Sequence, residues 1–299
     1  TTMKFGASLE LKADPLGIGF GFGGVEPGTL HAHGQLHEVH RVSYSIGLAG
    51  EYLLHVRLRQ QALALPGSPF KLTVRPGAAY AKSTRLPEGT IRGMVGTGSD
   101  AGCTRELRTA DKMGNMCMVG GALVKLLVEE HDVDTEVVDR GDGTYQLRWK
   151  SKLSGHFKTH ITIDGEDVIG SPTSFSLTSS TPALSNSSLK GDGLKTAVAG
   201  KPTTISIKFV DQYSNTALPG KDFQFGMSIG KDKDKLAHAK PHAFEGQWEP
   251  GETGIYFLTY KPTQAGTCEL HVWCDPNAKG ERVPFPGSPF HVAVSPGVA

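Results

Sequence analysis

The chain has 299 residues, with 31 basic and 30 acidic side chains and a formal net charge of +1. This length allows two or three domains, and the near-zero charge gives no electrostatic reason to expect nucleic acid as a partner. The 38 glycines and 18 prolines, together with many short apolar runs, indicate an all-β protein with many turns. No apolar run approaches the roughly 18 residues of a membrane span, so we expect no direct membrane insertion by this fragment.

The first part of the chain contains a glycine-rich run. Gly19–Gly24 fits the pattern G-x-G-x-x-G, but Pro27 and Gly28 follow where a dinucleotide site needs a helix. We therefore interpret this run as a loop and expect no cofactor.

A histidine-rich run follows, in which four histidines fall within ten residues. His31 and His33 have the spacing of metal ligands on one strand face, but no Cys or Asp accompanies them. The letters HEVH also differ from the metalloprotease pattern H-E-x-x-H. We therefore expect a solvated strand–turn–strand segment and no metal; the four residues are His31, His33, His37 and His40.

One nine-residue motif occurs three times in the sequence. "PGSPFKLTV" (66–74) and "PGSPFHVAV" (286–294) are nearly identical, and "IGSPTSFSL" (169–177) is a weaker copy. Their middle glycines lie about 100 residues apart, which is the size of one small domain rather than a solenoid unit. The repeat therefore predicts tandem domains.

Further landmarks recur in the same order. "TADKMGN" (109–115) matches "FVDQYSN" (209–215), with Asp and Asn at equal spacing after an alternating strand, a pattern typical of a turn. Residues 140–161 and 250–272 each contain a turn, a strand, a turn with Gly and a strand, and residues 41–56 show the end of this series. Turn signals every 8 to 12 residues are typical of a β-sandwich of about seven strands.

Taken together, these motifs resemble the filamin-type immunoglobulin-like repeats. The resemblance rests on the Asp-x-x-x-Asn turn, the "GDGTY" turn and the terminal "PGSPF-x-V-x-V-x-PG", and it covers nearly the whole chain. It implies tandem seven-stranded sandwiches without an antibody-type disulfide. We expect repeat one at 1–76, N-terminally incomplete or divergent, repeat two at 77–180, and repeat three at 181–297 with a longer middle insertion at 230–242.

The Gly-Ser-Pro motif is expected to bend the chain into its last strand. Gly adopts backbone shapes that other residues resist, and Pro restricts φ and lacks a donor. The following Phe70 or Phe290 is expected to enter the core. Repeat two has Thr173 at that place and Phe175 two residues later, so the register of its last strand stays open.

The chain has four cysteines, too few for a disulfide-stapled secreted scaffold. Cys268 and Cys274 lie too far apart on one extended strand to pair, whereas Cys103 and Cys117 flank a turn where pairing is open. Reduced thiols are the favoured state, and they favour a cytosolic chain.

The strand expected at 121–130 is apolar on both faces. Val124, Leu126 and Val128 share one face, and Leu123 and Leu127 the other, although a sandwich buries one face only. In filamin-like repeats partner peptides add as a strand beside the third strand, in the groove with the fourth, which implies residues 122–129 with 134–138 opposite. Packing between neighbouring repeats is the alternative. The candidate partner-binding residues are Leu123, Lys125, Leu127 and Glu129.

No nucleophile, base or ligand set is assembled in the sequence, so we expect no enzyme. We interpret the chain as structural and protein-interaction repeats of a larger cytoskeletal scaffold, located in the cytoplasm, that docks protein or peptide ligands by strand addition. The family would add actin cross-linking, but the actin-binding part is not in this chain. Thr1 begins abruptly and Ala299 ends a linker-like stretch, so we expect a longer parent protein.

The alternative is the adhesion ectodomain of a cell-surface protein with such repeats, as in plant or algal gamete-attachment proteins. Asn186 in "NSS" is a formal glycosylation acceptor and leaves this extracellular alternative open.

Overall fold

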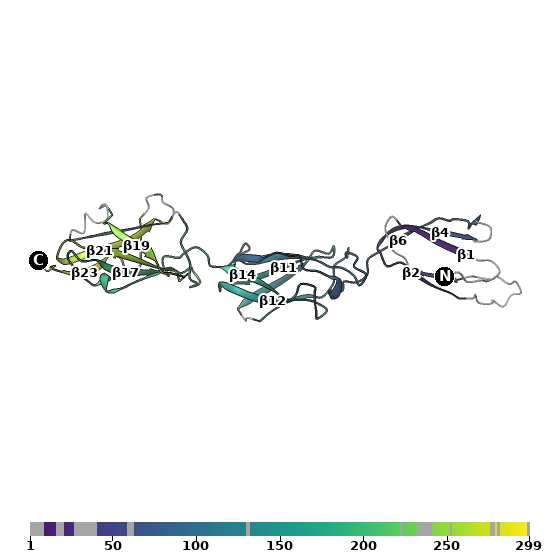
Figure 1. Cartoon of the computed structure of the whole chain (residues 1–299), viewed down its shortest axis with the longest axis horizontal. Helices are drawn as coiled ribbons and strands as arrows, with labels where there is room; N and C mark the ends of the chain where they lie inside the picture. The colour runs from purple at the N-terminus through teal and green to yellow at the C-terminus, as the bar shows by residue number, and fades with distance from the viewer. Residues whose placement is uncertain are drawn as a thin grey trace.

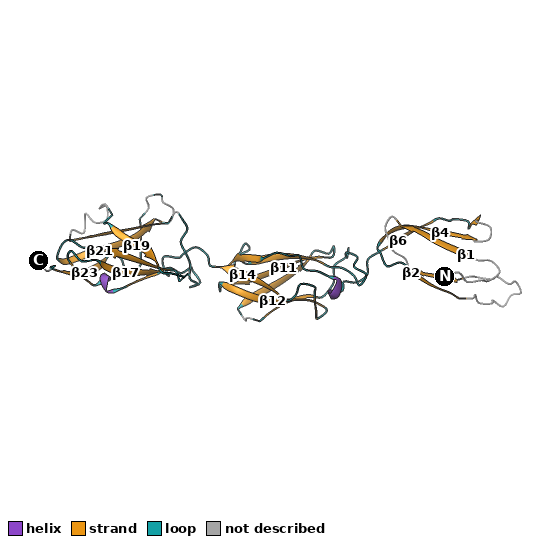
Figure 2. Cartoon of the chain, in the orientation of Figure 1, coloured by secondary structure: helices purple, strands orange, loops and turns teal. Residues whose placement is uncertain are grey.

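The structure is a computed structural model that describes residues 9–15, 21–26, 41–58, 63–129, 132–221, 223–231, 241–251, 253–275, 279 and 282–297. Its strands fall into three groups, which Figure 1 shows end to end along the longest axis. Strands dominate and the described helices are single 3-10 turns, so the chain is all-β, as expected (Figure 2). Within these described ranges, no helix is long and apolar enough to cross a membrane.

The described strands of repeat one correspond to the third and later strands of repeat two. β1 pairs with β4 as β9 pairs with β12, and β2 pairs with β3 as β10 pairs with β11. The strands are β1 (Leu9–Pro15), β2 (Gly21–Glu26), β3 (Arg41–Ser45), β4 (Gly50–Leu58), β5 (Leu63–Ala64) and β6 (Phe70–Val74).

Repeat two is a sandwich of two sheets. One sheet has the order β10-β11-β8, and the other runs β9-β12-β14-β7, with the short β13 also paired to β12. The elements are η1 (Ala81–Ser83), β7 (Ile91–Met94), β8 (Cys103–Arg108), β9 (Val124–Val128), β10 (Val133–Asp139), β11 (Thr144–Ser151), β12 (Gly155–Ile163), β13 (Glu166–Asp167) and β14 (Thr173–Thr178).

Repeat three has the same plan, with its first strand divided between the two sheets. One sheet has the order β15-β17-β20-β19 and the other β16-β23-β21-β18, with β22 paired to β21. The elements are β15 (Ser188–Lys190), η2 (Asp192–Leu194), β16 (Thr196–Val198), β17 (Thr203–Lys208), β18 (Gln224–Gly230), β19 (Phe244–Trp248), β20 (Ile255–Tyr260), β21 (Gly266–Asp275), β22 (Val283–Pro284) and β23 (Phe290–Ser295).

Repeats two and three have separate cores. The alternation of β11 buries Tyr145, Leu147 and Trp149 on one face, because successive residues of a strand point to opposite faces. Phe175 stacks on both Trp149 and Phe157 in this core, with ring centroids 5.4 and 5.1 Å apart. Phe175, two residues beyond the expected place, therefore supplies the core aromatic of the last strand in repeat two.

The expectation that Phe70 and Phe290 enter the core is wrong for Phe70 and holds only in part for Phe290. Phe70 is 44% exposed, and Phe290 is only partly buried against the edge of its core. Gly287 has φ +86°, and a Cβ built there lies 3.2 Å from the Phe290 ring. The ring therefore covers the turn, whereas Val292 one step further along the same face fills the core.

The serine of Gly-Ser-Pro has a role that the sequence did not reveal. In each repeat its hydroxyl accepts a hydrogen bond from a backbone N–H of the preceding long strand: Ser68 from Val56, Ser171 from Ile161 and Ser288 from Val272, at 2.8 to 2.9 Å. These N–H groups lie where strand pairing is interrupted, so the hydroxyl satisfies a donor that would otherwise be unpaired.

All four cysteines are free and buried. Burial raises the pKa of Cys103 to about 12 and that of Cys274 to about 11, which keeps both thiols protonated.

The Asp-x-x-x-Asn turn joins repeat one to repeat two. Asp111 and Asn115 bond to each other, and the Asn115 amide donates to Gly47 O and accepts from Ala49 N–H, both at 2.9 Å. The Asp111 carboxylate also accepts from Gly77 N–H at 2.8 Å. Three backbone groups of repeat one and its linker are therefore held by two side chains of repeat two.

The same arrangement joins repeats two and three. The Asn215 amide donates to Lys152 O at 2.7 Å and accepts from Ser154 N–H at 2.9 Å, and Asp211 accepts from Ser180 N–H at 3.1 Å. We call each Asp–Asn pair with its three backbone partners a junction clamp. Two clamps with matching partners explain why the repeats follow one another in line in Figure 1.

The junction clamps are expected to titrate in acid. Burial alone would raise the pKa of Asp111, but hydrogen bonds from Asn115, Gly77 and Met113 more than offset it and lower the pKa below its ordinary value of 3.8. The same balance lowers the pKa of Asp211. A depressed pKa contributes stability that is complete above the ordinary value and is lost as pH falls through the folded-state value.

We therefore expect the Ala49 and Ser154 amide NMR signals to be constant from neutral pH to about pH 4 and to shift together below it. The control is Asn115→Ala, in which the Ala49 signal should lose this titration. A midpoint at or above 3.8 would show that the clamps do not favour the carboxylates.

Candidate functional site

Strand β9 lies at an edge of its sheet and pairs with β12 alone. Its alternation buries Val124 and Leu126 in the core and leaves Lys125 and Leu127 outside. Strand β10, an edge strand of the opposite sheet, contacts β9 from across the sandwich. The structure thus places the third and fourth strands at one open side of repeat two.

The free edge of β9 presents backbone groups at Leu126 and Val128. The carbonyl of Leu123 accepts from Asp164 N–H at 3.1 Å, so Leu123 bonds toward the β12 side. Since residues along an antiparallel strand alternate between bonding to one side and the other, Lys125 and Leu127 also bond toward β12. The N–H and C=O groups of Leu126 and Val128 then point outward, and no described residue hydrogen-bonds to them from that side.

The predicted site residues lie together along this edge. Leu123 and Leu127 are 54% and 55% exposed, with Lys125 between them on the same outward phase. Glu129 follows in the same phase and forms a 3.5 Å ion pair with Lys158 of β12. Exposed leucines beside an unpaired strand edge are a hazard for association, which Lys125 partly blunts.

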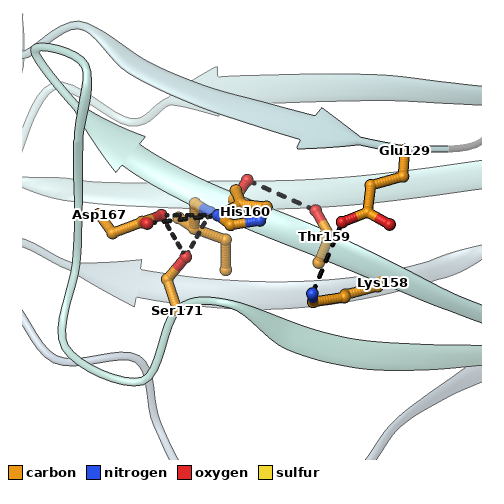
Figure 3. A network of polar contacts seen from close by, with 7 residues as sticks. Glu129, Lys158, Thr159, His160, Asp167 and Ser171 are labelled. Carbon is orange, nitrogen blue, oxygen red and sulfur yellow. Dashed lines mark hydrogen bonds and ion pairs between the residues drawn. The ribbon is translucent and has the colours of Figure 1, made fainter.

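A polar network lies on the outer face of β12 next to this edge (Figure 3). His160, the register partner of Leu127, contacts Asp167 through Nδ1 at 3.2 Å, and Ser171 Oγ donates to Asp167 at 2.6 Å. The Ser171 hydrogen bond, followed by that of His160, lowers the pKa of Asp167.

This network contains Ser, His and Asp but does not have the geometry of a hydrolase triad. In a triad the serine hydroxyl bonds to the histidine that removes its proton. Here Ser171 donates to the carboxylate of Asp167 and accepts from Ile161 N–H, as its counterparts Ser68 and Ser288 accept from their own strands. The arrangement supports the turn and offers no activated nucleophile.

The equivalent edge in repeat three is occupied. The register of β18 on β21 places Met227 at the position of Leu126. Met227 O accepts a 2.7 Å hydrogen bond from His242 N–H, at the end of the insertion that the sequence predicts. On the outer face, Trp273 lies over Gly226, where a built Cβ would be 2.4 Å from the indole. Repeat three therefore covers with its own residues the edge that repeat two leaves free.

Repeat one differs at the same register positions. Glu10, Lys12 and Asp14 of β1 correspond to Lys125, Leu127 and Glu129 of β9. Among the described residues, repeat two is therefore the repeat that has a leucine at these register positions and an unoccupied backbone edge beside it.

A second apolar surface was missed by sequence reasoning. Met116, Met118 and Val119 are half or more exposed beside the first junction clamp, where they line a hollow of about 760 Å³ with residues of repeat one. The signal in the sequence is the run "NMCMVGG", whose apolar residues follow the Asp-x-x-x-Asn turn without strand alternation.

The other candidates gain no site. The four histidines, His31 to His40, lie outside the described residues. The described part of the glycine-rich run, residues 21–24, belongs to strand β2 and not to the expected loop. Among the described residues no three His, Cys, Asp or Glu side chains gather to hold a metal, and the expectation of no metal stays a prediction. The Asn186 amide nitrogen bonds to the backbone carbonyls of Asp211 and Gln212 at 3.4 and 3.3 Å.

Two comparisons concern the sequence. A family model described as the Filamin/ABP280 repeat matches residues 97–174 and 181–291. Filamin-C of Mus musculus is 25% identical over 253 residues, which is 84% of this chain but 8% of that protein. The chain thus spans less than a tenth of the length of this relative.

Solved structures share the fold at low identity. FdeC, an Escherichia coli adhesin, superposes with a TM-score of 0.52 and 17% identity over 82% of this chain and 74% of its own. Invasin, described as a bacterial integrin-binding protein, superposes with a TM-score of 0.53 and 14% identity over 97% of this chain and 53% of its own. At these identities the likeness concerns tandem sandwiches and not what they bind.

Proposed function

Because this chain belongs to the Filamin/ABP280 repeat family, we propose that it is a non-catalytic array that presents the free edge of β9 to an extended peptide. The observation that carries the proposal is the contrast between two equivalent carbonyls. Met227 O in repeat three receives an N–H from its own chain, whereas Leu126 O in repeat two has no such donor among the described residues. A partner strand would supply that donor.

The edge sets the chemistry of the partner. An added strand would exchange backbone hydrogen bonds with Leu126 and Val128, and these provide affinity without reading sequence. Its alternate side chains on the outer face would lie beside Leu123 and Leu127, so apolar residues are favoured there. An acidic residue between them would face Lys125. The partner is therefore an extended segment that alternates apolar positions around an acidic one.

The test is Leu127→Glu in the whole chain. Peptides selected from a displayed library on the immobilised chain should lose affinity by about tenfold or more, because a carboxylate replaces the apolar contact. In the NMR spectrum of the unaltered chain, the same peptides should shift the amides of Leu126 and Val128.

The matched control is Leu218→Glu, which alters an equally exposed leucine of repeat three. It should leave peptide affinity unchanged. Since Leu127 is exposed, Leu127→Glu should change the stability of repeat two by less than about 0.5 kcal/mol. Peptides that bind both variants equally, or a repeat two that unfolds, would contradict the proposal.

The setting of this array has two candidates. Relatedness to Filamin-C supports repeats of a cytoskeletal scaffold in the cytoplasm, with partner docking as their role. The fold shared with FdeC and invasin supports a cell-surface adhesin, in which linked repeats hold a binding end away from the surface. Labelling of intact cells with an antibody to repeat three separates them, since only the adhesin is accessible without permeabilisation.

A further inference from the structure

A group of methionines lies beside the first junction clamp. Three of the six methionines of the chain fall within residues 113–118, and we call Met113, Met116 and Met118 the junction methionines. They are 62%, 50% and 70% exposed, so small solutes can reach their thioethers. Cys117, which lies among them, is buried, with its Sγ 3.7 Å from Gly77 O. The junction methionines are therefore the sulfur groups of this junction that are open to solvent.

Met113 covers the loop of repeat one that the first junction clamp holds. A Cβ built on Gly47 would lie 2.7 Å from Met113 Cε, so the methyl group of Met113 fills the space that a side chain at position 47 would need. Asn115 binds Gly47 O and Ala49 N–H of the same loop. The backbone of Met113 is fixed as well, since its N–H donates to the Asp111 carboxylate at 2.9 Å. The clamp and its apolar cover thus come from a single turn.

The second junction has the same cover without a thioether. When the two Asp-x-x-x-Asn turns are aligned, the residue at the place of Met113 is Tyr213, which packs against the core of repeat two. In both turns this residue therefore contacts the preceding repeat. The counterparts of the three junction methionines are Tyr213, Thr216 and Leu218.

We propose that the junction methionines are an oxidation site, at which peroxide loosens the junction between repeats one and two and leaves the junction between repeats two and three unchanged. The thioether sulfur attacks one oxygen of hydrogen peroxide with a lone pair. The S–O bond forms as the O–O bond breaks, and the other oxygen leaves as water after proton transfer. The sulfur is oxidised by two electrons to the sulfoxide, and the peroxide is reduced by two.

Oxidation is expected to act through the cover that Met113 provides. A sulfoxide is polar, and its oxygen needs a hydrogen-bond donor or water. The end of Met113 lies against Gly47, where the neighbouring Ala49 N–H already donates to Asn115. The oxidised side chain therefore turns toward solvent, and water reaches the hydrogen bonds between Asn115 and the loop. This consequence does not depend on peptide binding at β9.

The experiment treats the whole chain with hydrogen peroxide and locates the sulfoxides by mass spectrometry of its proteolytic peptides. Amide hydrogen exchange is then measured at Ala49, with Ser154 of the second junction clamp as the internal standard. Exchange at Ala49 should become faster by about threefold or more, while exchange at Ser154 stays the same. Methionine sulfoxide reductase with dithiothreitol should restore the original exchange at Ala49.

Two variants form a matched pair. Met113→Leu keeps an apolar cover that cannot become a sulfoxide, so peroxide should leave exchange at Ala49 unchanged. Met94→Leu alters a 49% exposed methionine of the same repeat outside the group, and peroxide should speed exchange at Ala49 as in the unaltered chain. A third variant, Met113→Gln, introduces polarity without an oxidant and should speed exchange at Ala49 by itself. Slow exchange of the core amides of repeat two verifies that each variant is folded.

Three outcomes would overturn the proposal. The first is that peroxide forms no sulfoxide at Met113. The second is that Met113 sulfoxide forms and exchange at Ala49 does not change, and the third is that faster exchange persists in Met113→Leu.

Discussion

Phe175→Ala is expected to lower the free energy of unfolding of repeat two by about 3–5 kcal/mol. The Phe175 ring is 1% exposed and stacks on Trp149 and Phe157, so its removal leaves a cavity bounded by two aromatic rings. The measurement is urea denaturation followed by NMR, which resolves each repeat separately. Repeat three should unfold at an unchanged urea concentration, because its core is separate.

Two other phenylalanines provide matched controls for this change. Phe290→Ala should cost repeat three less, about 1–2 kcal/mol, since the ring is only partly buried. Phe70→Ala should cost repeat one under about 1 kcal/mol, because nearly half of the side chain is already in solvent. An equal loss of unfolding free energy in all three variants would contradict this expectation. It would show that Phe70 and Phe290, which directly follow Gly-Ser-Pro, contribute to their cores as much as Phe175 does.

Asp211→Ala is expected to destabilise repeat three by about 3 kcal/mol and to loosen its junction with repeat two. The carboxylate is fully buried and accepts from the N–H groups of Tyr213, Asn215 and Ser180. Alanine leaves these donors without a partner, which costs more than the loss of an exposed hydrogen bond. Denaturation measures the loss of stability of repeat three. Faster amide exchange at Ser154, together with small-angle scattering that indicates a wider range of angles between the repeats, measures the loosening of the junction.

Two variants separate the turn from the clamp. Asn215→Ala retains the bonds of Asp211 to its own turn and to Ser180 N–H but removes the two bonds that Asn215 makes to Lys152 and Ser154. It should therefore speed exchange at Ser154 with a smaller loss of stability. Asp192→Ala alters an exposed aspartate of the same repeat and should change neither quantity. If Ser154 exchanges equally fast in the unaltered chain and in Asp211→Ala, the clamp does not hold the junction.

Local patterns in the sequence determine most of the fold. The alternation of Tyr145, Leu147 and Trp149 predicts that they share one buried face, and the structure buries all three. The sequence also places Val124 and Leu126 on the face opposite to Leu123 and Leu127. In the structure the first two are buried and the last two exposed. Strand period and turn residues act over a few neighbouring positions, so they can be read from one segment alone. The binding role of Leu123, Lys125, Leu127 and Glu129 stays a prediction.

Only the tertiary structure decided which groups are paired across long distances in the chain. Asn115 and Asn215 read as turn residues, yet each also binds a loop more than 60 residues earlier. His242 lies in an insertion with no recognisable motif, and its N–H bonds to the edge of β18 in repeat three. The equivalent edge in repeat two, that of β9, is free. Phe70 and Phe290 follow an identical Gly-Ser-Pro, yet Phe70 is exposed and Phe290 is only partly buried against its core. Burial depends on what the rest of the sheet places opposite each ring. Hydrogen bonds and contacts between distant segments depend on how the strands come together in space, which the spacing of residues along the chain does not encode.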